Sequence, residues 1–320
     1  MTATFVLSAD VEGLWGLFFV RSYVEDQRVA EGGLVGLPAL SRGMAERGLK
    51  GTFAFVGHLF HERCGPWEAG ERPHPEFPRP EYDWYDRDWL ADDPGTDEDR
   101  DPLWYGRRQA QATAADGHEI GAHGYVHAIL DESQVGPEIA RAELEHASRA
   151  AEEAGLGPLR SFIFPQNVVG HVDELTRAGY LCYRDTDGGR PVRAGPPGGL
   201  GRALNLARHA LGTTPFVGKP RVRDDGLVVI PSSFPLIGRE GLRKGVTRAA
   251  RVARIERGLR AAAESGAVLH PWTHPHAFGT QAARDDLLAI LDRVALWRDR
   301  GDVRVLTMGE LAAEARGERS

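Results

Sequence analysis

Two histidines stand four residues apart in the segment 116–127, among glycines and directly after a short apolar run. His123 and His127 at this spacing can bring their imidazoles together if the chain turns helically between them. Neutral imidazole is a common ligand of zinc and of similar divalent ions. Two ligands do not complete such a site, so we expect a third from another part of the chain.

Two carboxylates follow the first apolar run of the chain. Residues 3–9 are typical of a strand buried in a parallel sheet, and this run ends at Asp10 and Glu12. Because alternate residues of a strand face the same side, both acids should lie together at its carboxyl end. The alternative is a pair of loop acids that cap or solvate a turn.

A third group of polar side chains follows a late apolar run. Residues 267–269 predict a strand, and His270, His274 and His276 come directly after it. In barrels of alternating strands and helices, the carboxyl ends of the strands meet on one face, where active sites form. We therefore expect the late histidines to meet the two acids and the His123–His127 pair.

The elements that must position these side chains alternate between short apolar runs and amphipathic segments, which favours a parallel α/β sheet. Residues 137–154 predict the clearest helix, with Pro137 in its first turn and Gly155 at its end. The chain has 320 residues and shows neither an internal repeat nor a linker. We expect one barrel-like catalytic domain spanning residues 1–320.

Residues 61–105, called the insertion below, interrupt this alternation. The insertion holds four of the seven tryptophans, and between Glu81 and Asp101 ten acidic residues face only Arg87 and Arg100. A loop of this length in a compact domain is usually functional or disordered, and its aromatic residues argue against disorder. We predict a lid or a substrate wall, with a plain surface insertion as the alternative.

Composition narrows the class of protein. The formal net charge of −7 argues against general nucleic-acid affinity. No stretch of about 18 uninterrupted apolar residues predicts a membrane span, and the N-terminus does not read as an export signal, so we expect a cytoplasmic protein. The only two cysteines, Cys64 and Cys182, lie far apart and are expected to be reduced.

These motifs together resemble the polysaccharide deacetylase family, the NodB-homology or family 4 carbohydrate esterases. Residues 8–12 are similar to its first motif, 118–127 to its histidine motif, and 269–272 to its late Leu-His or His-Pro-Trp element. Residues 162–167 match its proline-containing third motif more weakly. The resemblance implies a distorted (β/α) barrel of about seven strands, of the glycoside hydrolase–deacetylase type.

The resemblance also implies roles for individual residues. It makes Glu12, His123 and His127 ligands of one divalent metal ion, with zinc as the first expectation and cobalt or nickel as alternatives. It makes Asp10 the general base and His270 the general acid, with His274 and His276 as rivals for the acid role. The family's third motif usually adds an arginine near its proline, but no arginine flanks Pro165 here.

The implied function is metal-dependent hydrolysis of an N-acetyl group on an amino sugar in a saccharide or glycan precursor. Substrate contacts are expected from Trp272, Pro165, Asn167 and His274, although core packing is an equal alternative for Trp272. The basic segment 239–260 would suit a phosphate- or lipid-linked saccharide, or form a solvated outer helix. Alternatives are metal-independent hydrolysis of a cyclic amide or ureide and non-catalytic carbohydrate binding, and the oligomeric state stays unassigned.

Overall fold

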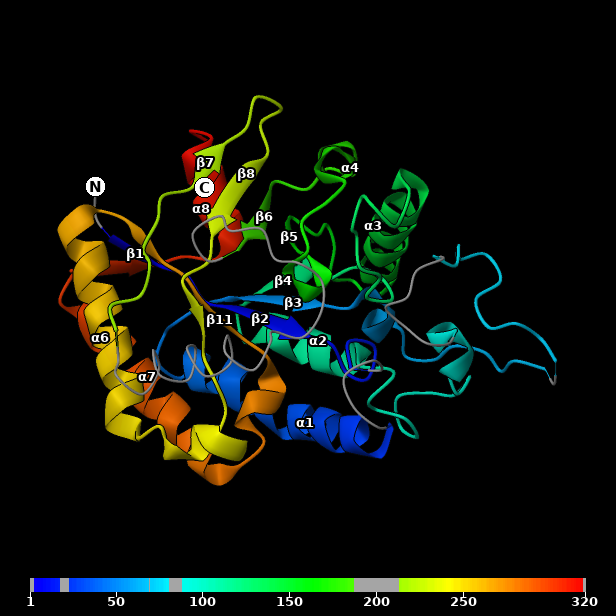
Figure 1. The fold of residues 1–320 in the computed structure, drawn as a ribbon, viewed down its shortest axis with the longest axis horizontal. Coiled ribbons are helices and arrows are strands. Elements are labelled where there is room, and N and C mark those ends of the chain that lie inside the picture. Colours follow the sequence, from blue (N-terminus) through cyan, green and yellow to red (C-terminus); the bar gives the residue numbers. More distant parts are fainter. Residues whose placement is uncertain (1–2, 18–22, 69, 81–87, 187–212, 319–320) are drawn as a thin grey trace.

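The structure is a computed structural model that describes residues 3–17, 23–68, 70–80, 88–186 and 213–318. Its described strands form a nine-stranded sheet in the order β7-β8-β6-β5-β4-β3-β2-β11-β9 and a three-stranded sheet in the order β10-β1-β12. The pairs with a printed register are parallel, apart from the antiparallel β7–β8 pair. Figure 1 shows helices arranged around this curled sheet.

The strands are β1 (Ala3–Phe5), β2 (Ser8–Val11), β3 (Thr52–Phe55), β4 (Glu119–Ala122), β5 (Ser161–Ile163), β6 (Cys182–Asp185), β7 (Arg221–Val222), β8 (Val228–Pro231), β9 (Phe234–Pro235), β10 (Val268–Leu269), β11 (Pro271–Thr273) and β12 (Val303–Val305). The α-helices are α1 (Tyr23–Ala45), α2 (Arg107–Ala115), α3 (Pro137–Glu153), α4 (Val172–Arg177), α6 (Arg248–Ser265), α7 (Gln281–Asp299) and α8 (Met308–Ala315). Short 3₁₀ helices are η1 (Gly57–Phe60), η2 (Trp89–Asp92), η3 (Pro165–Asn167), η5 (Gly241–Gly245) and η6 (Pro275–Phe278).

The first apolar run of the chain contributes one strand to each sheet. Its β1 half pairs with β10 and β12, and its β2 half pairs with β3 and β11. The run at 268–273 is divided in the same way at His270. These two divisions, together with the two-residue strands β7 and β9, explain why the described strands outnumber the expected seven or so. The predicted distorted (β/α) barrel is confirmed. The sequence did not reveal β11, because its Pro-Trp-Thr sequence lacks the pattern of a strand.

Helix α8 closes the amino end of the barrel. Met308, Leu311 and Ala312 pack with apolar side chains that the strands turn inward, including Val6 and Ile230. The first turn of α8 is hydrogen-bonded to side chains at the starts of β3 and β4, with Met308 N 2.8 Å from Oγ1 of Thr52. Only the carboxyl ends of the strands are therefore available for a site.

Helix α1 runs from Tyr23 to Ala45. Its glycines and Pro38 disfavour a helix, but they suit its close packing against η6. A Cβ atom at Gly36 would lie 1.9 Å from the carbonyl oxygen of Pro275. The tertiary contact therefore needs the small residues that make the helix hard to predict.

The basic segment expected as one helix over 239–260 is divided into η5 and α6. Arg239, Arg248 and Arg251 all reach the buried carboxylate of Asp286 on α7, at 2.7, 3.0 and 3.2 Å. This part of the basic segment therefore fixes α6 and the preceding loop to α7. Asp286 thus pairs with three arginines at once.

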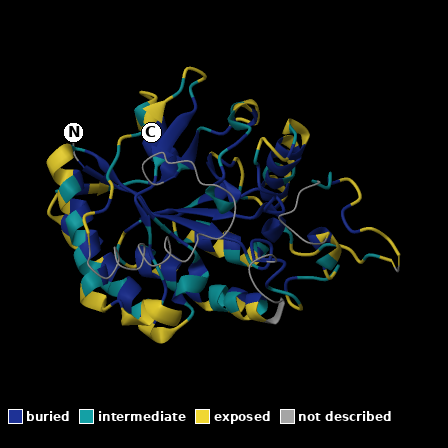
Figure 2. Cartoon of the chain, viewed as in Figure 1, coloured by how far each residue is buried: buried dark blue, intermediate teal, exposed yellow. Residues whose placement is uncertain are grey.

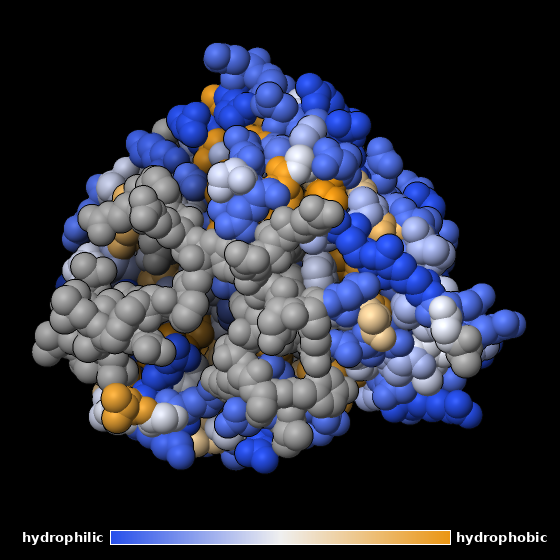
Figure 3. Space-filling view, turned by 45° about the vertical axis from the view of Figure 1, so that its right-hand side comes forward, coloured by the Kyte–Doolittle hydropathy of each residue, from blue (hydrophilic) through white to orange (hydrophobic). Residues whose placement is uncertain are grey.

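Burial follows the layers of the fold. Figure 2 shows a buried central sheet and outer helices whose exposed residues face away from it. The face turned forward in Figure 3 is mainly hydrophilic, with hydrophobic residues in small groups. In the described part of the chain, no helix is long and apolar enough to cross a membrane.

Candidate active site

The predicted metal ligands meet at the carboxyl ends of β2 and β4. Oε1 of Glu12, directly after β2, lies 3.3 Å from Nε2 of His123 and 3.4 Å from Nε2 of His127. The three ligand atoms all lie within 4.8 Å of one another, and all three side chains are buried. The structure therefore brings the three predicted ligands together.

The histidine loop converges through a left-handed turn rather than the helical turn that the spacing suggested. Gly124 and His127 have φ values of +75° and +64°, and no helix follows β4 at this point. Glu143 on α3 fixes the turn, because its carboxylate accepts the backbone N–H groups of Tyr125 at 2.6 Å and Val126 at 3.2 Å. A Cβ atom at Gly124 would lie 2.1 Å from this carboxylate, so the position requires glycine.

The donor set fits a divalent cation. Nδ1 of His123 lies 2.8 Å from the carbonyl oxygen of Ile163, which can only accept a hydrogen bond. Nδ1 therefore carries the proton, and Nε2 has a lone pair free to bind a metal ion. Burial lowers the pKa of His127, which favours its neutral form. Burial acts to raise the pKa of Glu12, but His274 and the histidine hydrogen bonds outweigh it and hold the pKa well below its usual value. Two neutral imidazoles and one carboxylate leave positions open for water and substrate.

Arg184, at the carboxyl end of β6, holds Asp10 in a buried bidentate ion pair. Its Nη1 and Nη2 atoms lie 2.6 and 2.7 Å from the two carboxylate oxygens of Asp10. Burial acts to raise the pKa of Asp10, but the charge and hydrogen bonds of Arg184 outweigh it and lower the pKa. Asp10 is therefore ionised and fixed in orientation at neutral pH.

Sequence reasoning assigned no partner to Asp10, since the arginine expected near Pro165 is missing. The guanidinium group of Arg184 enters from the next strand and donates to Oδ1 of Asn167 at 2.8 Å, while Pro165 is buried in η3. The sequence offered one sign of this partner, namely an arginine near the carboxyl end of a predicted strand. The same guanidinium group lies 4.6 Å from the centre of the Trp272 ring.

The structure separates the histidines that compete for the acid role. His270 is fully buried, with Nε2 2.9 Å from Oγ of Ser8, and burial together with the charge of Arg184 lowers its pKa to about 3. His274 has a side chain that is 30 % exposed, and its Nε2 lies 3.3 Å from Oε1 of Glu12 and 4.0 Å from Oδ2 of Asp10. Burial acts to lower the pKa of His274, but the charge and hydrogen bond of Glu12 together with the charge of Asp10 outweigh it and raise the pKa.

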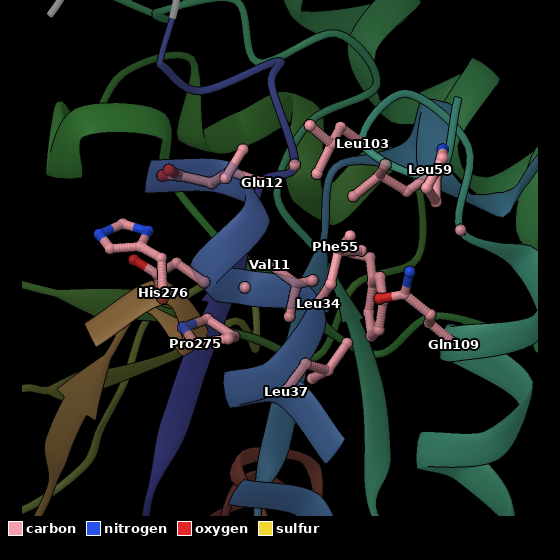
Figure 4. A pocket seen from close by; sticks show the side chains of 16 residues that line it. Val11, Glu12, Leu34, Leu37, Phe55, Leu59, Leu103, Gln109, Pro275 and His276 are labelled. Atoms are coloured by element: carbon pink, nitrogen blue, oxygen red, sulfur yellow. The ribbon is translucent and has the colours of Figure 1, made fainter. Parts of the chain in front are cut away.

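A pocket of about 300 Å³ opens beside these groups. Glu12, Gln166, Trp272, His274 and His276 contribute to its lining, and no described residue of the insertion does. This volume is in the usual range for a small-molecule site. A second cavity beneath Glu12 measures only about 30 Å³, and Figure 4 shows the Glu12 carboxylate and the His276 ring turned away from its apolar lining. The larger pocket is the candidate substrate site.

The insertion packs beside the loop that follows Glu12. Trp89 and Trp104 are buried, and Nε1 of Trp89 donates to the carbonyl oxygen of Val126 at 3.1 Å. Leu103 accepts a backbone hydrogen bond from Leu14 at 2.9 Å. Trp84, one of the four tryptophans expected in a wall, lies outside the described residues. Through these contacts the insertion packs against the histidine loop and the loop after Glu12.

The fold is similar to solved structures described as polysaccharide deacetylases. One from Mycobacterium smegmatis has a TM-score of 0.62 and 17% identity, covering 100% of this chain and 94% of its own. One from Pseudomonas aeruginosa PAO1 has a TM-score of 0.57 and 14% identity, covering 99% and 92%. An allantoinase has a TM-score of 0.58 and 13% identity, covering 99% and 93%.

The sequence itself matches no family model and no curated protein. At these identities the structural likeness concerns the fold alone. It confirms the deacetylase-type barrel that the resemblance implies, and the same architecture also accommodates the allantoinase.

Proposed function

We propose that this protein is a metal-dependent hydrolase that removes an N-acetyl group from an amino sugar in a saccharide or glycan precursor. The observation that carries the proposal is the convergence of two histidine Nε2 atoms on Oε1 of Glu12, next to Asp10. The group lies at the edge of a pocket that Trp272 helps to line.

Glu12, His123 and His127 would hold the ion, which we expect to be zinc, with cobalt or nickel as alternatives. When bound there, such an ion would polarise an amide carbonyl and make a water molecule easier to deprotonate. The buried ligands and their neighbours keep this chemistry away from bulk solvent. Glu143 and the carbonyl oxygen of Ile163 hold the two histidines in place from outside.

Asp10 accepts the proton of the attacking water. The ion pair with Arg184 keeps its carboxylate ionised and fixes the direction in which its oxygens point. Arg184 does not face the substrate in this assignment. It is a positioning residue that acts through Asp10.

His274, rather than His270, donates the proton to the departing amine in this proposal. His274 lines the pocket and its Nε2 is within 4.0 Å of Asp10, whereas His270 lies beneath the Asp10–Arg184 pair and contacts Ser8. His270 therefore has a structural role in this proposal, since it contacts Ser8, which also contacts Arg184. This assignment follows from the side of the site that each ring faces.

The pocket lining supports a sugar as substrate. Trp272 offers an aromatic surface of the kind on which apolar faces of sugars pack, and Gln166 adds a hydrogen-bonding group between Pro165 and Asn167. Arg243 on η5 also lines the pocket and would suit a phosphate-linked saccharide. Pro165 and Asn167 shape this wall through η3 and Arg184.

The test measures acetate release from a panel of N-acetylhexosamine compounds by protein that is stripped of metal and then reloaded with zinc, cobalt or nickel. We expect release with metal, a loss in Glu12→Gln, and ordinary activity in the exposed control Glu46→Gln. No acetate from any compound with fully metallated protein contradicts the proposal.

The similarity to an allantoinase suggests a rival reaction, hydrolysis of a cyclic amide or ureide, which can be tested on the same protein sample. Metal-stripped protein that opens a cyclic amide or ureide, with no effect of Glu12→Gln on metal content, favours the metal-independent alternative. Saccharide binding that survives Asp10→Asn without any turnover favours a carbohydrate-binding protein. The three readings thus give different results in one set of assays.

A further inference from the structure

A second cluster of metal-binding side chains lies outside the candidate active site. Cys64, His74 and Asp93 belong to the insertion, and His58 belongs to η1 directly before it. One ligand atom from each of the four lies within 4.8 Å of the others. His58, His74 and Asp93 are buried and Cys64 is half-buried. The cluster thus combines one sulfur, two nitrogen and one oxygen donor.

His58 presents a lone pair to a carboxylate. Its Nδ1 lies 3.2 Å from the carbonyl oxygen of Trp104, which can only accept, so Nδ1 carries the proton of the neutral ring. Nε2 makes no hydrogen bond to the described residues, yet it lies 3.3 Å from Oδ2 of Asp93. Two electron-rich atoms facing each other in a buried place repel unless a proton or a metal ion lies between them.

Asp93 is oriented as metal-binding carboxylates are. Its Oδ1 accepts hydrogen bonds from the hydroxyl of Tyr105 and from the N–H of Gly95 at 3.0 Å. Its Oδ2 accepts a hydrogen bond from Nε2 of His74 at 2.6 Å and also faces Nε2 of His58 at 3.3 Å, so both imidazoles meet at this one oxygen. Outer hydrogen bonds of this kind fix the direction of a ligand carboxylate, just as the Trp104 carbonyl fixes the ring of His58.

The donor types distinguish this cluster from the Glu12 site. Four protein donors that include a thiolate form a closed set, which is typical of structural zinc, whereas three donors without sulfur leave positions open for catalysis. Zinc binding requires the Cys64 thiol to release its proton to solvent. The other cysteine, Cys182, lies in the apolar interior of the barrel with Ile163 and Val228.

The cluster is placed to hold the insertion against the loop that bears Glu12. The carbonyl oxygen of Trp104 accepts from Nε1 of Trp15 at 3.2 Å as well as from His58. The ring of Trp15 also packs on His58, with centres 4.3 Å apart. Apart from η2, the described residues of the insertion form no helix or named strand, and an isolated antiparallel bridge between Arg63 and Asp97 joins its two ends. Between these ends the segment depends mainly on turns and side-chain contacts.

We propose that His58, Cys64, His74 and Asp93 form a structural zinc site that fixes the insertion to the loop after β2. This site is separate from the one formed by Glu12, His123 and His127. The proposal does not depend on the reaction that the protein catalyses.

Cobalt is the probe that tests it, because a thiolate bound to cobalt gives a charge-transfer band in the near ultraviolet that histidine and carboxylate ligands do not. Metal-stripped, reduced wild-type protein is titrated with cobalt, and bound metal is measured by elemental analysis. We expect the band to appear with one equivalent and to disappear when zinc replaces cobalt. A cobalt-saturated wild-type chain without the band overturns the proposal, whatever its total metal content.

The two cysteines supply a matched pair of variants. Cys64→Ala should lose the band and one equivalent of metal, whereas Cys182→Ala should keep both. Glu12→Gln should keep the band while losing the other equivalent, so failure at one site is distinguishable from failure at the other. Tyr105→Phe should keep the band but weaken cobalt binding by roughly 10- to 100-fold, as expected for loss of an outer hydrogen bond. A band of equal strength in Cys64→Ala contradicts the assignment.

Discussion

The described part of the chain holds two groups of histidines around a carboxylate, and different kinds of structure position them. Glu12 and His123 follow directly after paired strands, and His127 lies in the short turn after the second of these strands, so the backbone hydrogen bonds of the sheet fix where the group begins. The group around Asp93 takes most of its donors from a segment with little regular structure. The first group is held by the barrel, and the second must be held by its own contacts.

This difference bears on what a metal ion does in each place. A site supported by a sheet keeps its shape without the ion, so its open positions can serve chemistry. A closed site in an irregular segment contributes its binding free energy to folding of that segment. We therefore expect changes at Glu12 to affect turnover most, and changes at Cys64 to affect the order of the insertion most.

The largest expected effect separates the two groups by activity. Glu12→Gln should lower acetate release by roughly 10³-fold or more, because a bound cation lowers the barrier by several kcal/mol. When both proteins are stripped of metal, its thermal unfolding midpoint should stay close to that of the Glu46→Gln control. A Glu12→Gln protein with ordinary turnover would show that the barrel site is not the catalytic one.

The second effect concerns the buried pair beside the barrel site. Arg184→Met leaves the Asp10 carboxylate buried without its partner and should destabilise the fold by about 3–5 kcal/mol, measured by urea unfolding. Arg316→Met, which breaks a surface pair with Glu318, should cost about 1 kcal/mol or less. The double change Asp10→Asn with Arg184→Met should recover part of the loss. If the double variant is no more stable than Arg184→Met, the unpaired Asp10 carboxylate is not the cause of the lost stability.

The third effect concerns the insertion. Chelation should speed proteolytic cleavage within residues 61–105, because zinc at 100 times its Kd stabilises the folded form by about 2.7 kcal/mol. Cys64→Ala should be cleaved as fast without chelator, and Cys182→Ala should behave like wild type. Equal cleavage rates for Cys64→Ala and wild-type protein, both loaded with zinc, would show that a metal at Cys64 does not order the insertion.

The smallest effect comes from a charge cluster that needs no metal. Burial acts to raise the pKa of Asp286, but Arg239 and its neighbours outweigh it and lower the pKa. A carboxylate with a lowered pKa stabilises the fold above its ordinary value near 3.8, and this contribution is lost as the pH falls through the lowered pKa. Asp286→Asn should therefore lower the unfolding midpoint at pH 7, and its difference from wild type should shrink as the pH falls below 3.8, whereas Asp285→Asn should change little over the same range.

Much of the barrel could be predicted because its strands are short apolar runs that end in polar residues. Parallel strands place such ends on one face, so Asp10, Glu12, His123 and His127 could be grouped from the sequence. Helix α1 could not be delimited, since Gly36 and Pro38 favour other conformations until η6 packs against them. Its extent depends on a partner more than 200 residues away in the chain.

The supporting residues of the site were missed for the same reason. Arg184 approaches Asp10 across 174 positions, and Glu143 reaches the histidine loop from a helix where it reads as one charge among many. The cluster of His58, Cys64, His74 and Asp93 follows no motif spacing, because an irregular segment folds back on itself to form it. Pattern reasoning detects regular periods, and these contacts have none.

The sequence by itself determined the order of strands and helices and the residues that end the strands, because hydrophobic periodicity and backbone geometry act locally. Only the tertiary structure decided which charge accompanies Asp10, which late histidine faces the pocket, and which donors surround Asp93. Such choices depend on distances between segments far apart in the chain, and these distances exist only once the barrel has closed around its core.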